Sequence, residues 1–328
     1  MSRTEHRETA ADLAADAALL EIAEALGLSS LLDRTEPLTL DEMCAAAALP
    51  EPAVTSFLRA LLAAGLVEQG SDARNFVPCA DMADRRYAAG YLSWSLNANR
   101  PYIDHAPEFL RDPEAAGRRY SRDGRRVAVS SRWVGSRGFY PGVIAEITGR
   151  KPRRIVDLGA GAGGLLIRLL STLPDCTGLA LDLSPAACDA AERAAAEAGM
   201  GERLEVVNRS VESLVDDPSP LRDADVVHAG FVMHDVAGRP DVLDGVLRAC
   251  HASVADGGCL VVTDAVPYAE GERERAFSAL FTYLHASSMD VRLPAEEEWR
   301  AAFRRAGFQN VGVTPLPMPG SRVFVAQR

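Results

Sequence analysis

The fold of this chain is decided by the stretch Asp157-Leu158-Gly159-Ala160-Gly161-Ala162-Gly163-Gly164. It continues the apolar run Arg154-Ile155-Val156, which has the composition of a buried strand, and a helical pattern follows from Leu165 to Leu170. Glycines between a strand and a helix allow the main chain to approach a ligand at the carboxyl end of the strand. The string also satisfies G-x-G-x-x-G through Gly159, Gly161 and Gly164, so a nicotinamide cofactor is one alternative.

Further apolar runs of strand length follow, and helical patterns separate them. The runs are Gly178–Asp182, Leu204–Val207, Ala224–Val227 and Cys259–Thr263. Parallel strands that are covered by helices on both faces have this pattern. The last two runs, Val311–Thr314 and Ser321–Ala326, are joined by a short Pro/Gly loop, which leaves no room for a crossover helix and predicts a hairpin.

Composition and charge limit the class of protein and its partners. The chain has 328 residues, enough for two domains, and a formal net charge of −11, which disfavours nucleic acid as a partner. No apolar run reaches the roughly 18 residues of a membrane span. The start, Met1 to Glu8, lacks the apolar core of a secretory signal, so we expect a cytoplasmic protein. The six cysteines are scattered without a C-x-x-C pair, which is typical of reduced core residues.

The first 90 residues combine helical patterns with a short hairpin. Helical segments are expected from about Ala10 to Leu32 and from Val54 to Ala64. Between them, another helix is expected to begin after Thr39, which acts as its N-cap. A strand at Gly65–Glu68 is expected to pair with Phe76–Pro78. This is the pattern of a winged helix. Because its second helix carries Arg59 but no basic cluster, DNA binding is the weaker alternative.

Three features favour S-adenosylmethionine (SAM) over a nicotinamide cofactor. They are Asp157 two residues before the first glycine, Asp182 at the end of the second strand, and the terminal hairpin. Asp182 is placed to accept both ribose hydroxyls of the adenosine. A simple helix cap before Ser184-Pro185 is the alternative role of this carboxylate.

On these residues, the part from about 150 to 328 resembles a class I SAM-dependent methyltransferase, and the whole chain resembles dimeric small-molecule methyltransferases with a winged-helix N-terminal domain. The resemblance implies a Rossmann-like seven-stranded sheet with a reversed C-terminal hairpin, and a homodimer formed through the N-terminal helices. It places cofactor contacts at Asp157, Gly159, Gly161, Gly163 and Asp182, at Leu183, and at Ser210 in the turn after the third strand. This turn lacks the Gly-Asp pair that is usual in the family.

The fourth strand is followed by Phe231-Val232-Met233-His234-Asp235-Val236. O-methyltransferases of this architecture have a histidine, an aspartate and a tryptophan there, and the histidine deprotonates a phenol. The histidine is retained as His234 and the tryptophan is not. A lone histidine is often structural, but one beyond the carboxyl end of the fourth strand is expected to face the cofactor.

A second histidine, His285, stands where O-methyltransferases usually have a Gly-Arg-Glu-Arg stretch. In this respect the chain resembles the phenylpyruvate C-methyltransferases and related enzymes that methylate the β-carbon of α-keto acids for nonribosomal peptide precursors. The resemblance implies a metal ion held by His234 and His285, which would stabilise the enolate of the substrate. Two imidazoles and a chelating keto acid suit iron, zinc, nickel or cobalt.

The segment before the sheet also resembles this second family. Trp94, Tyr120 and Arg122 correspond to its substrate-binding residues, and a guanidinium suits a bidentate contact with the keto-acid carboxylate. A solvated arginine is the alternative for Arg122, and Ala286 replaces the acidic residue that this family has beside its second histidine.

The sequence thus predicts a dimerisation domain at 1–90, a helical linker at 91–149 that contributes to the substrate pocket, and a SAM-binding catalytic domain at 150–328. The leading hypothesis is metal-dependent C-methylation of an α-keto acid, with catalytic roles for His234, Asp235 and Arg122. The first alternative is O-methylation with His234 as general base and no metal. A second is an idle regulator that senses SAM.

Overall fold

The computed structural model describes residues 10–328, which form two compact units. The first contains the N-terminal residues up to Ala106 together with Arg118–Arg137, and the second contains Pro107–Gly117 and Gly138–Arg328. The expected linker at 91–149 is divided between these units, so its role as one substrate-binding segment stays a prediction. The stretch from Met1 to Glu8, on which the expected cytoplasmic location rests, lies outside the described residues.

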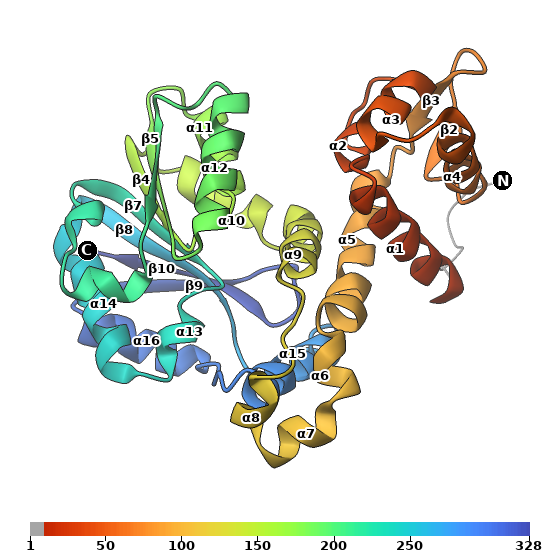
Figure 1. Cartoon of the computed structure of the whole chain (residues 1–328). Coiled ribbons are helices and arrows are strands. Elements are labelled where there is room, and N and C mark those ends of the chain that lie inside the picture. Colours follow the sequence, from red (N-terminus) through yellow and green to blue (C-terminus); the bar gives the residue numbers. More distant parts are fainter. Residues whose placement is uncertain (1–9) are drawn as a thin grey trace. The chain divides into compact units, whose positions relative to one another are not determined.

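The first unit begins with helices around a small antiparallel sheet of order β1-β3-β2 (Figure 1). The β2–β3 pairing and the Thr39 cap of α3 confirm two predictions, because Val67 pairs with Pro78 and the Thr39 side chain accepts from the Glu42 N–H. The elements are α1 Ala10–Ala25, α2 Ser29–Leu32, β1 Leu38–Thr39, α3 Leu40–Ala47, α4 Glu51–Ala63, β2 Val67–Gln69, β3 Asn75–Pro78 and α5 Met82–Leu92. Their identification as a winged helix remains a prediction.

Helix α4 begins at Glu51, earlier than the expected Val54. Pro52 lies in its first turn, where the missing N–H of proline has no helical partner to lose. The proline therefore belongs to the start of this helix.

Residues 93–138 remain helical, as predicted. They include a π-helical segment, whose i→i+5 hydrogen bonds widen the helix, at Ser93–Ala98. The other helices are α6 Arg100–Asp104, α7 Ala106–Arg111, α8 Pro113–Gly117 and α9 Gly124–Gly138.

The second unit is built on a seven-stranded sheet of order β6-β5-β4-β7-β8-β10-β9. The first five strands pair in parallel, whereas β10 is antiparallel to both β8 and β9. The strands are β4 Arg154–Leu158, β5 Thr177–Asp182, β6 Leu204–Asn208, β7 Ala224–Gly230, β8 Val254–Ala265, β9 Asn310–Pro315 and β10 Ser321–Gln327. The predicted α/β class and the reversed terminal hairpin are confirmed.

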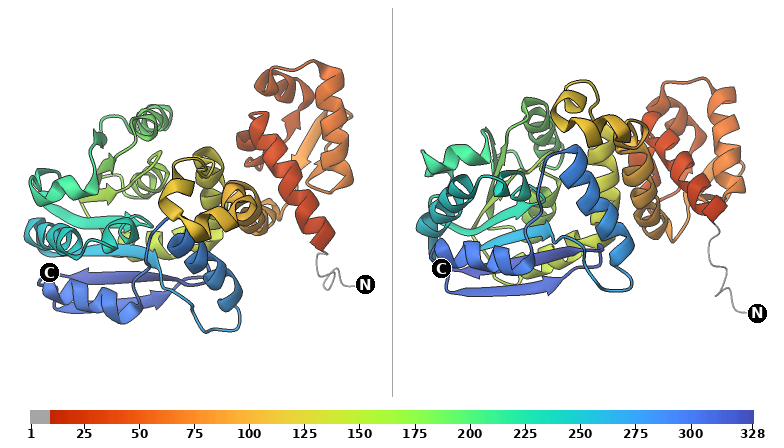
Figure 2. Two further views of the ribbon diagram at one scale, coloured as in Figure 1. Left: turned by 60° about the horizontal axis from the view of Figure 1, so that its bottom comes forward. Right: turned by 90° about the horizontal axis from the view of Figure 1, so that it is seen from below.

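Helices cover both faces of this sheet (Figures 1 and 2). One face is covered by α10 Tyr140–Thr148, α11 Gly164–Thr172 and α12 Pro185–Glu197, and the other by α14 Pro240–Ser253 and α16 Glu296–Arg305. The unit also contains the shorter elements η2 Val211–Val215, η3 Ser219–Leu221 and α13 His234–Ala237, the helix α15 Arg275–Ser288, and α8 with most of α7.

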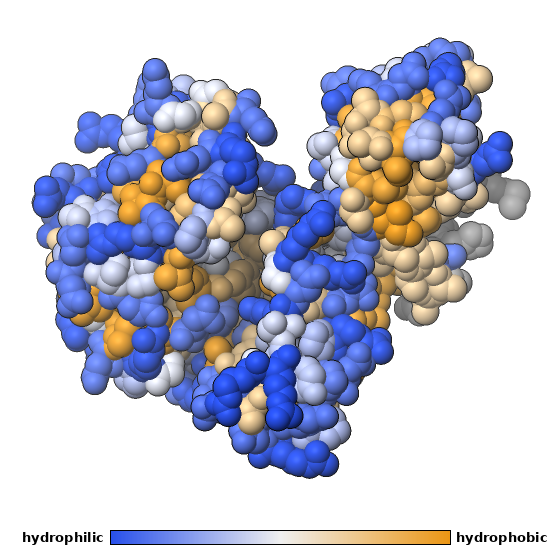
Figure 3. Space-filling view, in the orientation of Figure 1, coloured by the Kyte–Doolittle hydropathy of each residue, from blue (hydrophilic) through white to orange (hydrophobic). Residues whose placement is uncertain are grey.

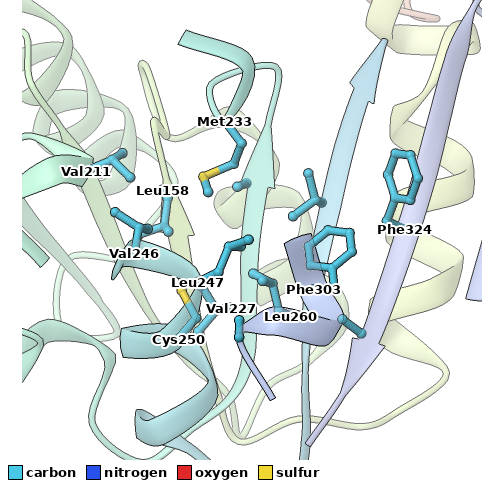
Figure 4. Close-up of a cluster of buried hydrophobic side chains, with 14 of the residues drawn as sticks. Leu158, Val211, Val227, Met233, Val246, Leu247, Cys250, Leu260, Phe303 and Phe324 are labelled. Atoms are coloured by element: carbon cyan, nitrogen blue, oxygen red, sulfur yellow. The ribbon is translucent and has the colours of Figure 1, made fainter. Parts of the chain in front are cut away.

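The core between the sheet and α14 fixes the position of α13, which begins at His234. Figure 4 shows Met233 in this core with Leu158 and Leu247, and Met233 is 0% exposed. Val236 is 3% exposed, so α13 is anchored on both sides of His234 by buried apolar side chains.

The surface of the described residues is mostly polar, as Figure 3 shows for one face. The first unit also has an apolar area on this face, and its exposed large apolar side chains are Ile22, Leu49, Leu96 and Ile103. All six cysteines are free thiols, and five are buried. No helix within residues 10–328 combines the length and the apolar character needed to span a bilayer.

Candidate active site

The glycine turn lies between β4 and α11, and three of its residues have left-handed backbone angles. Gly159, Gly161 and Gly163 have φ values of 69°, 55° and 73°. A Cβ at position 159 would lie 2.9 Å from the Cβ of Val232, so this position excludes any side chain. The N–H of Gly159 donates to the Leu181 carbonyl at 2.8 Å, which ties the turn to the end of β5.

Asp182 ends β5 and faces the same turn. Its Oδ2 accepts from the Gly161 N–H at 2.8 Å, and its Oδ1 accepts from the Ser184 N–H at 2.9 Å. The cap of α12 is Ser184, whose hydroxyl accepts from the Ala187 N–H, so Asp182 is not itself the helix cap. Because each carboxylate oxygen has a second lone pair, Asp182 retains the capacity to accept from ribose hydroxyls.

Leu183 and Ser210 lie next to Asp182 at this edge of the sheet. The Asn208 side chain donates to the carbonyls of Asp182 and Leu183, at 2.9 and 3.0 Å, and so joins the loops after β5 and β6. The Leu183 residue is 71% exposed, which leaves an apolar surface beside the carboxylate. Ser210 caps η2, since its hydroxyl accepts from the Ser213 N–H.

His234 forms a buried pair with Asp264, a residue that the sequence analysis did not select. The Nδ1 atom of His234 lies 2.6 Å from Oδ1 of Asp264, and the His234 N–H donates to Oδ2 at 3.2 Å. Asp264 is 0% exposed and His234 is 5% exposed. A carboxylate accepts, so the Nδ1 of His234 carries a proton and the lone pair of the neutral ring is on Nε2.

His285, which belongs to α15, lies close to His234. The two ring centroids are 5.2 Å apart in an edge-to-face arrangement. Because the Phe281 carbonyl can only accept, the His285 Nδ1 donates to it at 2.7 Å, and the lone pair of this ring is also on Nε2. The structure therefore brings together the two histidines that the sequence analysis paired.

The expected metal site finds limited support in the donor set. Within residues 10–328, no group of three or more His, Cys, Asp or Glu side chains is placed to hold a metal ion. Stable all-protein sites use three or four such ligands. The Asp235 carboxylate lies 3.5 Å from the His234 Nε2, and its side chain is 59% exposed.

The predicted substrate-binding residues Trp94, Tyr120 and Arg122 all belong to the first unit, whereas His234 and His285 belong to the second. Trp94 is 5% exposed in the π-helical segment. The Tyr120 ring stacks on His105 with centroids 3.6 Å apart. Within residues 10–328 Arg122 makes no ion pair and is half-buried, and its contact with a substrate stays a prediction.

Phe231 follows β7 directly and has a strained backbone, with a φ of 53°. Its N–H donates to the Thr263 carbonyl at 2.8 Å, and its ring centroid lies 4.9 Å from that of Phe139. Strained residues of this kind are concentrated at functional sites. This strain lies three residues before His234.

Comparison with known proteins finds a family match in the central part of this unit. Residues 156–260, which include the glycine turn and His234, match the family described as "Methyltransferase domain". Phenazine O-methyltransferase PhzM of Lysobacter antibioticus is 31% identical over 168 residues, which are 50% of this chain and 45% of that protein. The S-adenosyl-L-methionine-dependent methyl transferase PigF of Serratia sp. (strain ATCC 39006) is 22% identical over 182 residues, 55% of this chain and 50% of that protein.

The matching segments span about half the length of these curated relatives. A solved structure of PigF with SAH has a TM-score of 0.60 at 23% identity, and the match covers 95% of this chain and 96% of that one. This likeness shows that the two chains share their fold.

Proposed function

We propose that this protein is a SAM-dependent O-methyltransferase that acts on a hydroxyl group of a small molecule, with His234 as the general base. The observation that carries the proposal is the buried His234–Asp264 pair at the carboxyl edge of the methyltransferase sheet. The curated relative PhzM is named an O-methyltransferase, which favours transfer to oxygen over the C-methylation that the sequence analysis put first.

SAM would bind at the glycine turn. The proposed contacts are Asp182 with the ribose hydroxyls and the exposed Leu183 with the adenine, while Ser210 borders the adenine from the next loop. Asp157 and the three turn glycines would contact the methionine part. The bound cofactor supplies an electrophilic methyl group on a sulfonium.

The proposed step moves one proton and one methyl group. The substrate hydroxyl donates its proton to Nε2 of His234 as its oxygen attacks the methyl carbon, and the carbon–sulfur bond breaks to give neutral S-adenosylhomocysteine (SAH). Asp264, buried and hydrogen-bonded to Nδ1, stabilises the imidazolium that results. Orientation of the oxygen in line with the methyl group supplies the rest of the acceleration.

The remaining expectations on partners are also part of the proposal. Trp94, Tyr120 and Arg122 would bind the substrate, and the exposed apolar side chains of the first unit would be covered in a homodimer. Light scattering at micromolar concentration tests the dimer, and a monomer would contradict it.

The test of the function is transfer of labelled methyl groups from SAM to a panel of small phenols and hydroxylated heterocycles. We expect methylation of oxygen, located by mass spectrometry and NMR, and a loss of on the order of 100-fold in kcat for His234→Ala. The matched control is His285→Ala, which should retain most activity if His285 only lines the site. Methyl transfer to carbon alone, or full activity of His234→Ala, would overturn the proposal.

The second candidate is C-methylation of an α-keto acid. The observation that favours it is the proximity of His285 to His234, with both lone pairs on Nε2. It predicts methyl transfer to C3 of a 2-oxo acid, a bound metal in near-stoichiometric amount, and loss of that metal in His285→Ala. Protein without metal that methylates only oxygen would exclude this candidate.

A further inference from the structure

Three buried polar side chains form a row across adjacent strands β4, β7 and β8. The Nδ1 atom of His228 lies 2.7 Å from Oδ1 of Asp157, and its Nε2 lies 3.4 Å from the hydroxyl of Thr263. Asp157, His228 and Thr263 are 3%, 4% and 1% exposed. Asp157 pairs in register with His228, so both side chains lie on the same face of the sheet.

The hydrogen bonds assign the donors in this row. The carboxylate accepts, so the Nδ1 of His228 donates, and the Nε2 of the neutral ring accepts from the Thr263 hydroxyl. The ring is thus held at both ends. Room for it comes from Gly230, because a Cβ there would lie 3.0 Å from the Cε1 of His228.

Asp157 needs such a donor because of its position. In the middle of a parallel sheet the backbone N–H groups are used in strand pairing, and a buried carboxylate without a donor is costly. Helix α11 lies over this face, since a Cβ at Gly178, the neighbour of Ile155, would contact Leu166. The donor to the Asp157 carboxylate is therefore a side chain of the neighbouring strand, His228 of β7.

The second carboxylate oxygen of Asp157 has a different environment. Within residues 10–328, Oδ2 makes no hydrogen bond, and it is not among the fully buried side-chain atoms that lack a partner. Asp157 lies two residues before Gly159, where the backbone is shaped for close approach of a ligand. An anionic oxygen at this place suits a cationic donor such as an ammonium group.

We propose that His228 is the positioning residue of the cofactor site: it holds Asp157 so that Oδ2 accepts from the ammonium group of SAM or SAH. This inference rests on the proposed function, because it assumes a SAM cofactor at the glycine turn. His228 does not contact the cofactor in this arrangement. It acts through Asp157 and through the tether of its ring to Thr263.

The test compares two ligands that differ in the amino-acid part. SAH has the ammonium group, whereas methylthioadenosine has the same adenosine and thioether without it. His228→Leu keeps the size of the buried side chain and removes the donor, so we expect SAH to bind about tenfold more weakly and methylthioadenosine to bind as before. Calorimetry on the full chain measures both, and thermal unfolding of each variant confirms that it is folded.

Two further variants separate positioning from general damage. His228→Asn retains a donor near the Nδ1 position and should recover most of the SAH affinity. In an Asp157→Asn background, His228→Leu should have no further effect on SAH, because the carboxylate that it orients is gone. In turnover, His228→Leu should raise the KM for SAM and leave kcat at saturation nearly unchanged.

Each outcome decides between the two proposals. Equal losses for both ligands, an unchanged SAH affinity in His228→Leu, or a full effect in the Asp157→Asn background would overturn the role of His228. A wild-type protein that binds neither SAM nor SAH would instead overturn the proposed function.

Discussion

The substitution Asp264→Asn removes one negative charge from behind the proposed base and changes almost nothing in volume. Asp264 accepts three hydrogen bonds: from the Nδ1 of His234, from the His234 N–H, and from the Ala265 N–H. Oδ1 accepts two of them and Oδ2 the third. An asparagine has only one acceptor oxygen, so its amide group must face at least one of these N–H groups.

The magnitude follows from these contacts and from the burial of the pair. A hydrogen bond to a charged group contributes about 1.5–3 kcal/mol, and Asp264 is fully buried, so screening by solvent is small. At about 1.36 kcal/mol for each tenfold change in rate, kcat should fall roughly 10- to 100-fold. The mispaired amide should also lower the free energy of unfolding by about 1–3 kcal/mol.

The assay measures kcat and KM for labelled methyl transfer, together with the Kd of SAH. We expect kcat to fall and the Kd of SAH to stay within about twofold, because Asp264 acts on His234 and not on the glycine turn. The matched control is Asp235→Asn, whose side chain is 59% exposed and lies 3.5 Å from Nε2, and which should lower kcat less than about fivefold. Unchanged kcat in Asp264→Asn, or an equal loss in both variants, would refute the reasoning.

Three other predictions concern the cofactor turn and a pH-dependent ion pair. Asp182→Asn should weaken SAH binding by on the order of tenfold, measured by calorimetry. The Asp182 carboxylate accepts from the N–H groups of Gly161 and Ser184, and in the variant one of these N–H groups faces the N–H of the asparagine amide. Gly161→Ala should lower the free energy of unfolding by about 1–2 kcal/mol, because the backbone of Gly161 is left-handed. Gly159→Ala should lower it more, because the added Cβ also clashes with Val232 in the loop after β7. Equal losses in urea unfolding would contradict this. The hydrogen bond from Arg322 lowers the pKa of Glu274, so the stabilisation by this pair is present above the unfolded pKa of about 4.3 and is lost as pH falls through the lower folded pKa. The difference in stability between wild type and Glu274→Gln should therefore vanish on acidification, and a constant difference would show that the carboxylate charge is not involved.

The sheet could be predicted from the sequence because its strands are buried on both faces. Continuous apolar runs and the glycine turn after Leu158 gave the order of elements and the terminal hairpin. The ends of the strands and helices were harder to predict from the sequence. The strand at Ala224 continues to Gly230 and includes His228, whose polar side chain interrupts the apolar pattern. The start of α4 was placed too late because Pro52 is a helix starter as well as a breaker.

One residue of the site, Asp264, was not selected from the sequence. His234 could be selected because it follows a strand, but Asp264 lies at the end of an apolar strand, where nothing in the local pattern indicates its partner. The pairing of His234 with Asp264 depends on the neighbouring positions of β7 and β8, which are far apart in sequence. An acidic residue at the end of the fifth strand was the available signal.

The two histidine–aspartate pairs of this unit form the same hydrogen bond in different surroundings. In both, a buried carboxylate accepts from Nδ1 and so places the lone pair of the neutral ring on Nε2. The Nε2 of His228 faces Thr263 within the sheet, where its lone pair is engaged by a buried hydroxyl. His234 begins α13, beyond the strand end, and its Nε2 lies 3.5 Å from the largely exposed carboxylate of Asp235. Position relative to the strand end therefore fits one pair to its proposed role of holding a carboxylate and the other to its proposed role of taking a proton from a substrate.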